Sequence, residues 1–158
     1  MSVQKIPAGQ EMMIPHLVCD PCAEAIKFYQ KAFGAEVKQI MPGPDGRVMH
    51  ACLRLGNGSI FLADDFPEYC GGKAMSPKAL KGTPVTIHRY VEDCDAAVQR
   101  AADAGATITM APADAFWGDR YGVITDPFGH NWSFATHIKD MTPEEMKAAM
   151  AACFSQGS

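Results

Sequence analysis

Several features that mark other protein classes are missing from these 158 residues. No apolar run approaches the roughly 20 residues that a membrane-spanning helix requires, and the first residues, MSVQKIPAGQEMM, lack the basic-then-apolar layout of a signal peptide. The formal charge is −4 with no basic cluster to offset it, which argues against nucleic acid or an anionic membrane surface as a partner. Without a secretory signal, the six cysteines are expected to be reduced thiols of a cytoplasmic protein.

Sequence motifs for several common chemistries are absent as well. The chain shows no nucleophile–base arrangement, no Gly-rich phosphate loop and no Rossmann fingerprint, since GNG and GPDG are typical of turns. Basic residues interleaved with aromatics, which are typical of single-strand binding, do not occur. What is present is 47% apolar and 20% charged residues, the composition of a folded globular protein.

The chain contains a duplicated unit. HLVCDPCAEAI, from His16, aligns without gaps with HRYVEDCDAAV, from His88, at an offset of 88 − 16 = 72. Each copy begins with a strand-like run, MMIPHLV or PVTIHRYV, and continues with a helical pattern and three short strand-like runs. Asp-Gly, Asn-Gly and Asp-Pro-Phe-Gly separate these runs as turn signals. The sequence therefore predicts an α+β fold of two strand–helix–strand–strand–strand modules.

The helix of the first module has signals at both ends: Asp20 can be its N-cap with Pro21 at the first helical position, and Gly34 fits the C-cap. In the second module, Asp93 or Asp95 can cap the helix, and Gly105 ends it. We expect one domain, 1–158, with the following parts: module one at about 12–64, a linker at 65–82, module two at about 83–137 and a C-terminal helix at about 142–154.

The C-terminal helix is predicted from a capping box formed by Thr142 and Glu145. Met146, Met150 and Phe154 recur at helical spacing and form one apolar stripe. We expect this stripe to pack on the body of the protein or on a second subunit.

Four segments resemble the vicinal oxygen chelate (VOC) superfamily, which includes glyoxalase I, ring-cleaving dioxygenases and the bleomycin- and fosfomycin-resistance proteins. They are IPHLVCDPCAEAIKFYQKAFGAEV, MPGPDGRVMHACLRLGNGSIFLAD, VTIHRYVEDCDAAVQRAADAGATI and the GDRYG–DPFGH–W–ATH run, and they cover most of residues 12–137. The similarity is strongest to the PhnB-like, glyoxalase/bleomycin-resistance-type branch. The resemblance implies that each four-stranded sheet curls into a half-cup, that two half-cups close around a small-molecule ligand, and that the protein is a homodimer.

The resemblance also implies where a metal centre would lie, on the first and last strands of each module. The corresponding positions here fall near four residues, none of which is a ligand of His, Asp, Glu or Cys type: Ile14, Phe61, Thr86 and Ser133. A two-residue slip keeps the same strand face and brings in His16 and His88, but no carboxylate. We therefore expect no ordinary four-ligand centre and no resident cofactor, with His16 and His88 as the candidates if a divalent metal is bound.

Three histidines are candidates for the ligand pocket. His16 and His88 occupy equivalent positions of the two modules, so we expect both to face inward, and His50 on a later strand could face the same way. A neutral imidazole can act as a base, bind an anion after protonation or hold a metal.

The loop ADAFWGDRYG is the second candidate for the pocket. Phe116, Trp117 and Tyr121 supply flat apolar surface and Arg120 supplies a cation, a combination that suits an aromatic or acidic small molecule. Alternatively, the loop is a dimer seam in which Arg120 pairs with a carboxylate of the other subunit. Trp132 either packs in the sheet or lines the pocket.

The Cys-x-x-Cys of HLVCDPC is typical of a zinc knuckle or a redox pair. A knuckle needs two further ligands nearby, and the sequence shows none. Cys19 is expected to be a small core residue, while Cys22 lies near a helix start, where the helix dipole can lower a thiol pKa.

Two functions remain open. One is an enzyme, a glyoxalase-like lyase or isomerase or a dioxygenase-like protein, that acts on a small oxygenated metabolite by catalytic residues the sequence does not identify. The other is a metal-free dimer that sequesters an aromatic or cationic small molecule, as resistance proteins of the superfamily do. The missing ligand set favours binding or a reaction without metal.

Overall fold

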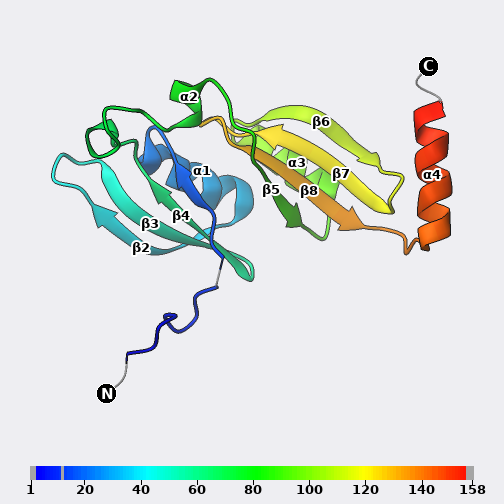
Figure 1. The fold of residues 1–158 in the computed structure, drawn as a ribbon, viewed down its shortest axis with the longest axis horizontal. Helices are drawn as coiled ribbons and strands as arrows, with labels where there is room; N and C mark the ends of the chain where they lie inside the picture. The colour runs from blue at the N-terminus through cyan, green and yellow to red at the C-terminus, as the bar shows by residue number, and fades with distance from the viewer. Residues whose placement is uncertain (1–2, 12, 156–158) are drawn as a thin grey trace. The chain divides into compact units, whose positions relative to one another are not determined.

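The computed structural model describes residues 3–11 and 13–155, and Met12, where the first module was predicted to begin, lies outside the described residues. The chain divides into two compact units between Thr83 and Pro84. Both have the same order of elements, strand–helix–strand–strand–strand (Figure 1).

The first unit is a four-stranded sheet with one main helix. Its elements are β1 (His16–Val18), α1 (Cys22–Phe33), β2 (Glu36–Pro42), β3 (Val48–Leu55) and β4 (Gly58–Ala63), followed by a 3-10 turn, η1 (Pro67–Tyr69), and a short helix, α2 (Pro77–Leu80). The strand order is β1-β4-β3-β2, with β1 parallel to β4 and the other pairs antiparallel. The apolar stripe of α1, which includes Ile26 and Tyr29, is buried on β2 and β3.

The second unit repeats this arrangement and adds a terminal helix. Its elements are β5 (Thr86–Tyr90), α3 (Cys94–Asp103), β6 (Thr107–Asp114), β7 (Asp119–Thr125), β8 (Asn131–His137) and α4 (Pro143–Ser155). The strand order is β5-β8-β7-β6, again with one parallel pair, β5 and β8. The predicted α+β fold of two βαβββ modules with a C-terminal helix is confirmed, and neither sheet is closed on itself. The closing of two half-cups around a ligand stays a prediction.

Helix α1 is capped by a residue far away in the sequence. It begins at Cys22, and its N-cap residue is Pro21, which offers no side-chain acceptor. Instead, Asp64 accepts hydrogen bonds from the N–H of Cys22 at 2.8 Å and from the N–H of Val48 at 2.6 Å. The prediction that Asp20 caps this helix was wrong, because the acceptor comes from the end of β4 and local spacing cannot reveal it. Buried to 7% exposure, Asp64 joins the starts of α1 and β3.

The other helix ends follow the local signals more closely. Gly34 is the C-cap of α1 with φ +66°, a backbone conformation that glycine adopts without strain. Asp93 is the N-cap of α3 and accepts from the N–H of Ala96 at 2.9 Å. The capping box of α4 is confirmed, because Thr142 and Glu145 exchange hydrogen bonds at 2.8 and 3.2 Å.

Helix α4 does not pack on the rest of the described chain. None of its described residues is buried, and Met146, Met150 and Phe154 are 37%, 43% and 73% exposed. The stripe therefore does not cover the body in residues 3–11 and 13–155, and its packing on a second subunit stays a prediction.

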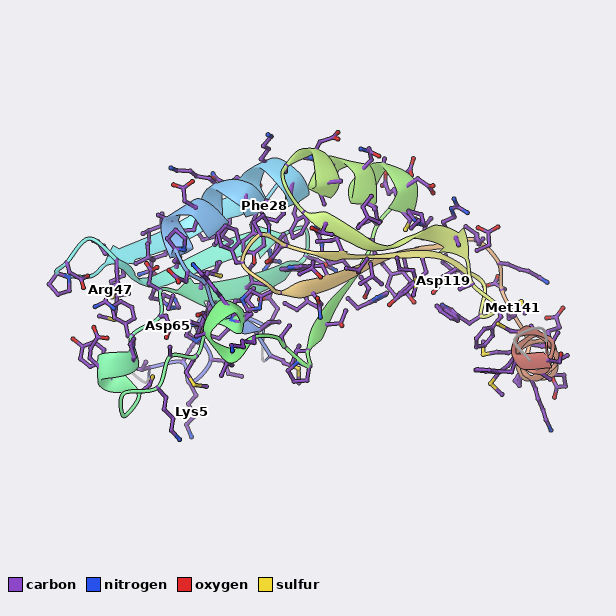
Figure 2. The ribbon with its side chains drawn as sticks, turned by 90° about the horizontal axis from the view of Figure 1, so that it is seen from above. Lys5, Phe28, Arg47, Asp65, Asp119 and Met141 are labelled. Carbon is purple, nitrogen blue, oxygen red and sulfur yellow. The ribbon has the colours of Figure 1, made fainter. Side chains whose placement is uncertain are left out.

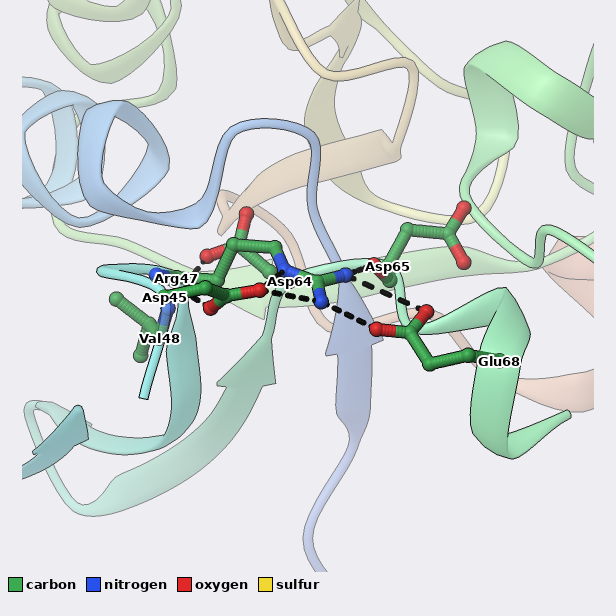
Figure 3. Close-up of polar contacts among 6 residues, drawn as sticks. All are labelled: Asp45, Arg47, Val48, Asp64, Asp65 and Glu68. Carbon is green, nitrogen blue, oxygen red and sulfur yellow. Dashed lines mark hydrogen bonds and ion pairs between the residues drawn. The ribbon is translucent and has the colours of Figure 1, made fainter. Parts of the chain in front are cut away.

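The segment predicted as a linker is tied to the hairpin between β2 and β3. The Arg47 guanidinium donates to the Asp45 carboxylate at 2.7 Å and to the backbone carbonyl of Asp65 at 2.9 Å, and it pairs with Glu68 (Figure 3). The Asp65 carboxylate accepts from the N–H of Ser76 at 2.8 Å. These contacts fix the start of the segment without a large apolar core.

Candidate functional site

Each sheet has one face covered by the helix of its own unit and a second face, called here the far face, that is turned away from that helix. Side chains alternate between the faces along a strand, and paired residues of neighbouring strands share a face. In the first sheet, Leu17, Leu62 and Ala51 are 6%, 0% and 0% exposed beneath α1. The residues adjacent to them along each strand therefore lie on the far face. They include His16 in β1 and Phe61, its paired neighbour, in β4.

The far face of the first sheet carries a cluster of three rings. The ring centroids of His50 and Phe61 are 4.7 Å apart, and His16 lies 5.9 Å from His50 and 6.1 Å from Phe61. Burial, and next the neighbouring His50, lower the pKa of His16. At neutral pH its neutral form is therefore favoured, and a neutral imidazole can accept a proton or a hydrogen bond.

The far face of the second sheet carries a longer chain of rings. His88 is hydrogen-bonded through Nδ1 to Ser133 Oγ at 2.8 Å, as the pairing of β5 with β8 allows. The His88 ring lies 4.8 Å from Tyr90 and 6.1 Å from Tyr121, and Trp117 lies 5.4 Å from Tyr121.

Phe116 extends this chain, with its ring 5.1 Å from that of Trp117. Four of the side chains predicted for the pocket are thus brought together in one unit: His88, Phe116, Trp117 and Tyr121.

A buried carboxylate anchors this group of rings. Asp119, at the start of β7, is 4% exposed, and it lies on the far face (Figure 2). Its Oδ2 accepts from the Trp117 indole N–H at 3.0 Å and from the Tyr90 hydroxyl at 3.3 Å. Its Oδ1 is 2.9 Å from Nδ1 of His137, whose Nε2 is 2.9 Å from the Asp140 carboxylate. Sequence reasoning missed this group of contacts, because it treated Asp119 as part of the loop ADAFWGDRYG.

The carboxylates of Asp119 and Asp140 shift the pKa values of the side chains that contact them. Hydrogen bonds to Asp140 and then to Asp119 raise the pKa of His137, because both favour the imidazolium form. The negative charge of Asp119 likewise raises the pKa of Tyr90, so the phenol stays protonated and continues to donate.

Arg120 and Trp132 are turned to the opposite face of the same sheet. Arg120 donates to Asp95 at 2.7 and 2.8 Å and to Asp114 at 3.0 Å, so its partners belong to its own unit. Trp132 is 0% exposed in the core under α3, and its indole N–H donates to Asp126 at 2.9 Å. Neither residue joins the ring cluster, because both alternate to the helix-covered side, where Trp132 packs in the sheet.

The cysteine pair near the start of α1 is buried and unbridged. Cys19 and Cys22 are both 0% exposed free thiols. Burial, and next the charge of Asp64, raise the pKa of Cys22 to about 12. The expectation that the helix dipole lowers this pKa was wrong, because loss of solvent outweighs the dipole at a fully enclosed thiol.

The donor set does not fit a four-ligand metal centre. In residues 3–11 and 13–155, no group of three or more His, Cys, Asp or Glu side chains could hold a metal ion. The paired neighbour of His16 is Phe61 and that of His88 is Ser133, so each histidine lacks a carboxylate beside it. In the same described part of the chain, no helix is long and apolar enough to span a membrane.

Comparison with known families matches residues 13–134 to the glyoxalase/bleomycin resistance protein/dioxygenase superfamily. The chain belongs to this superfamily. An uncharacterized protein of Mycobacterium tuberculosis (strain H37Rv) is 52% identical over 138 residues, which cover 87% of this chain and 81% of that one.

Solved structures of the superfamily share the fold. TioX from Micromonospora sp. ML1 is 25% identical with a TM-score of 0.65, over 81% of this chain and 99% of that one. TnmS3, an antibiotic binding protein from Streptomyces sp. CB03234, is 20% identical with a TM-score of 0.59, over 87% and 98% of the two chains. At that identity the second likeness shows the fold alone.

Proposed function

We propose that this chain belongs to the PhnB-like branch of the superfamily and is a cytoplasmic homodimer. In this proposal it binds a small aromatic or oxygenated molecule without a four-ligand metal centre. The binding surface is the far face of the second sheet. The observation that carries the proposal is the chain of rings on that face, held by hydrogen bonds of Trp117 and Tyr90 to the buried carboxylate of Asp119.

The rings offer flat apolar area with little freedom left to lose. Trp117 and Tyr90 are each tied to Asp119 through their polar atoms, and His88 is tied to Ser133. A ligand that stacks on these rings therefore costs little side-chain entropy, and preorganisation of this kind raises affinity. The hydroxyl and imidazole groups beside the rings can hydrogen-bond to oxygen atoms of the ligand.

The second candidate function is acid–base catalysis on the first sheet. His16 favours this alternative, because its lowered pKa keeps the imidazole neutral and able to accept a proton at pH 7. In that case the ligand is a substrate, and its turnover falls as the pH drops and His16 becomes protonated.

The test combines binding, turnover and metal content on the full chain. The protein is purified without chelator and analysed for bound metal, and its thermal unfolding is followed with a panel of small aromatic and oxygenated compounds. Binding raises the melting temperature with the logarithm of the ligand concentration above Kd, since a ligand at 100 times its Kd adds about 2.7 kcal/mol. Trp117→Ala removes this rise. The matched control is Tyr69→Ala, which deletes an aromatic ring that is 70% exposed in the first unit and leaves the rise unchanged.

Three outcomes contradict parts of the proposal. If Trp117→Ala leaves the stabilisation intact, the second sheet is not the binding surface. If a stabilising compound is consumed and His16→Ala abolishes the turnover, the protein is an enzyme. Stoichiometric metal that is lost in a His16→Ala/His88→Ala double variant overturns the metal-free assignment.

A further inference from the structure

The lysine and arginine residues in the strands of the second sheet all lie on the helix-covered face, and none lies on the far face. The four strands of this sheet contain only two cationic residues of Lys or Arg type, Arg89 and Arg120. Both alternate to the face under α3, where Arg89 lies 5.9 Å from the ring of Phe134 and Arg120 pairs with Asp95. The ring cluster thus has no strand lysine or arginine on its own side.

Two carboxylates lie close to the rings, with His137 between them. Asp119 accepts hydrogen bonds from Tyr90 and Trp117, and Asp140 contacts the other nitrogen of His137. With His137 protonated the three groups sum to −1, and with it neutral they sum to −2. The raised pKa of Tyr90, caused first by the charge of Asp119, is what a negative potential at the rings produces.

Lys139 follows β8. The hydrogen bond from the backbone N–H of Thr142, and next the positive charge of Lys139, lower the pKa of Glu145 in the first turn of α4. The charge of Lys139 is therefore partly balanced by Glu145.

We propose that this face selects ligands that carry a positively charged nitrogen, an alkylated ammonium group above all, over neutral or anionic ligands of the same shape. The inference rests on the proposed function and names the ligand class for the same surface. A cation held over Tyr and Trp rings is attracted by the negative face of each ring. Here the O–H of Tyr90 and the N–H of Trp117 both donate to the Asp119 carboxylate. The π electrons of the rings and the negative charge of Asp119 therefore both attract a cation.

This ligand class differs from the acidic small molecule that the loop sequence suggested as an alternative to an aromatic one. That expectation depended on the Arg120 cation facing the ligand, and Arg120 is instead neutralised by Asp95 and Asp114 on the opposite face. An anionic ligand over the rings would meet Asp119 and Asp140, and the strands of this face add no lysine or arginine to offset them.

The experiment follows the indole N–H signals of the full chain by ¹H–¹⁵N NMR. Only Trp117 and Trp132 give such signals, and a Trp117→Phe variant assigns the first. The protein is titrated at constant ionic strength with choline and with its neutral carbon isostere, 3,3-dimethylbutan-1-ol. A second series compares benzyltrimethylammonium, benzyl alcohol and benzoate. We expect choline to shift the Trp117 signal with an affinity about tenfold higher than that of the isostere.

Two variants locate the effect. Asp140→Asn removes an exposed charge without touching a ring, and we expect it to weaken the affinity for choline about twofold, as for a screened surface charge. Tyr90→Leu removes a ring and weakens it further, while Tyr69→Leu, in the first unit, leaves it unchanged.

The outcomes separate this inference from the proposed function. Equal shifts by choline and its isostere, or tighter binding of benzoate than of benzyltrimethylammonium, overturn the cation preference. If benzyl alcohol still moves the Trp117 signal in a saturable way, the surface binds neutral aromatics and the proposed function stands. If no probe moves the signal, both proposals fail.

Discussion

The first and last strands of the two units can be compared residue by residue, because the offset of 72 from the sequence repeat holds in both. His16 pairs with Phe61 in the first unit, and His88 pairs with Ser133 in the second. By the same offset, Asp64 corresponds to Thr136, whose hydroxyl donates to the carbonyl of Val91 at 2.9 Å. In the first unit, Asp64 accepts a hydrogen bond from the first residue of α1. In the second unit, Thr136 donates a hydrogen bond to Val91, which precedes α3.

The comparison shows that a duplicated module can keep its strand order while its stabilising contacts change places. Helix α1 takes its cap from the distant Asp64, whereas α3 takes its cap from the adjacent Asp93. The far faces differ in the same way. His50 and Tyr121 both neighbour the first-strand histidine of their own unit, and in the second unit the buried carboxylate of Asp119 lies on the far face as well.

The largest expected effect comes from removing the distant cap. Asp64→Ala leaves the N–H groups of Cys22 and Val48 buried without an acceptor, so we expect a loss of about 3 kcal/mol in the free energy of unfolding. Urea unfolding measures it. The control is Asp20→Ala, at the cap position that local spacing suggests, and we expect it to cost less than about 0.5 kcal/mol. Equal losses in the two variants would contradict the assignment of Asp64 as the cap.

A smaller effect is expected from the local cap of the second unit. Asp93 is exposed, so Asp93→Ala leaves the N–H of Ala96 within reach of water, and we expect a loss of about 1 kcal/mol. The same urea experiment compares it directly with Asp64→Ala. A loss as large as that of the buried variant would mean that burial of the acceptor does not decide the difference between the two helices.

The smallest expected effect concerns the histidine pKa values, which are lowered for His16 in the first unit and raised for His137 in the second. We expect His16 to titrate below and His137 above the roughly 6.5 of an unperturbed imidazole. The contribution of His137 to stability is complete below the unfolded-state pKa and is lost as the pH rises through its raised folded-state pKa. That of His16 is complete above the unfolded-state pKa and is lost as the pH falls toward its lowered folded-state value.

Imidazole NMR signals followed from pH 4.5 to 9 test this order, with His16→Gln and His137→Gln variants to assign the two signals. A titration of His16 at higher pH than His137 would contradict the environments described for the two faces.

The order of elements could be predicted because its causes are local. Apolar periodicity, turn dipeptides and the Thr142–Glu145 capping box act over a few residues and are visible in the chain. The Asp64 cap could not be found in this way, since its donor and acceptor are 42 positions apart in the sequence and come together only when β1 pairs with β4.

The candidate site was predicted in part for a similar reason. The rings of Trp117 and Tyr121 were recognised from residue type, but the direction of Arg120 depends on the residue at which β7 begins. Treating the segment as a loop hid the strand alternation that sends Asp119 and Tyr121 to one face and Arg120 to the other. The pKa of Cys22 was mispredicted for the same reason. The helix dipole can be inferred from the local sequence, whereas burial depends on the tertiary fold.

The parallel pairing of β1 with β4 and of β5 with β8 has a consequence for how the chain folds. The paired residues His16 and Phe61 are 61 − 16 = 45 positions apart, and His88 and Ser133 are 133 − 88 = 45 positions apart. In each unit the three antiparallel strands can pair through short turns. The first strand can pair with the last one only after the long chain segment between them has closed into a loop. Because that loop has the same length in both units, its closure entropy is the same, and any difference between their folding rates reports on side chains and not on topology.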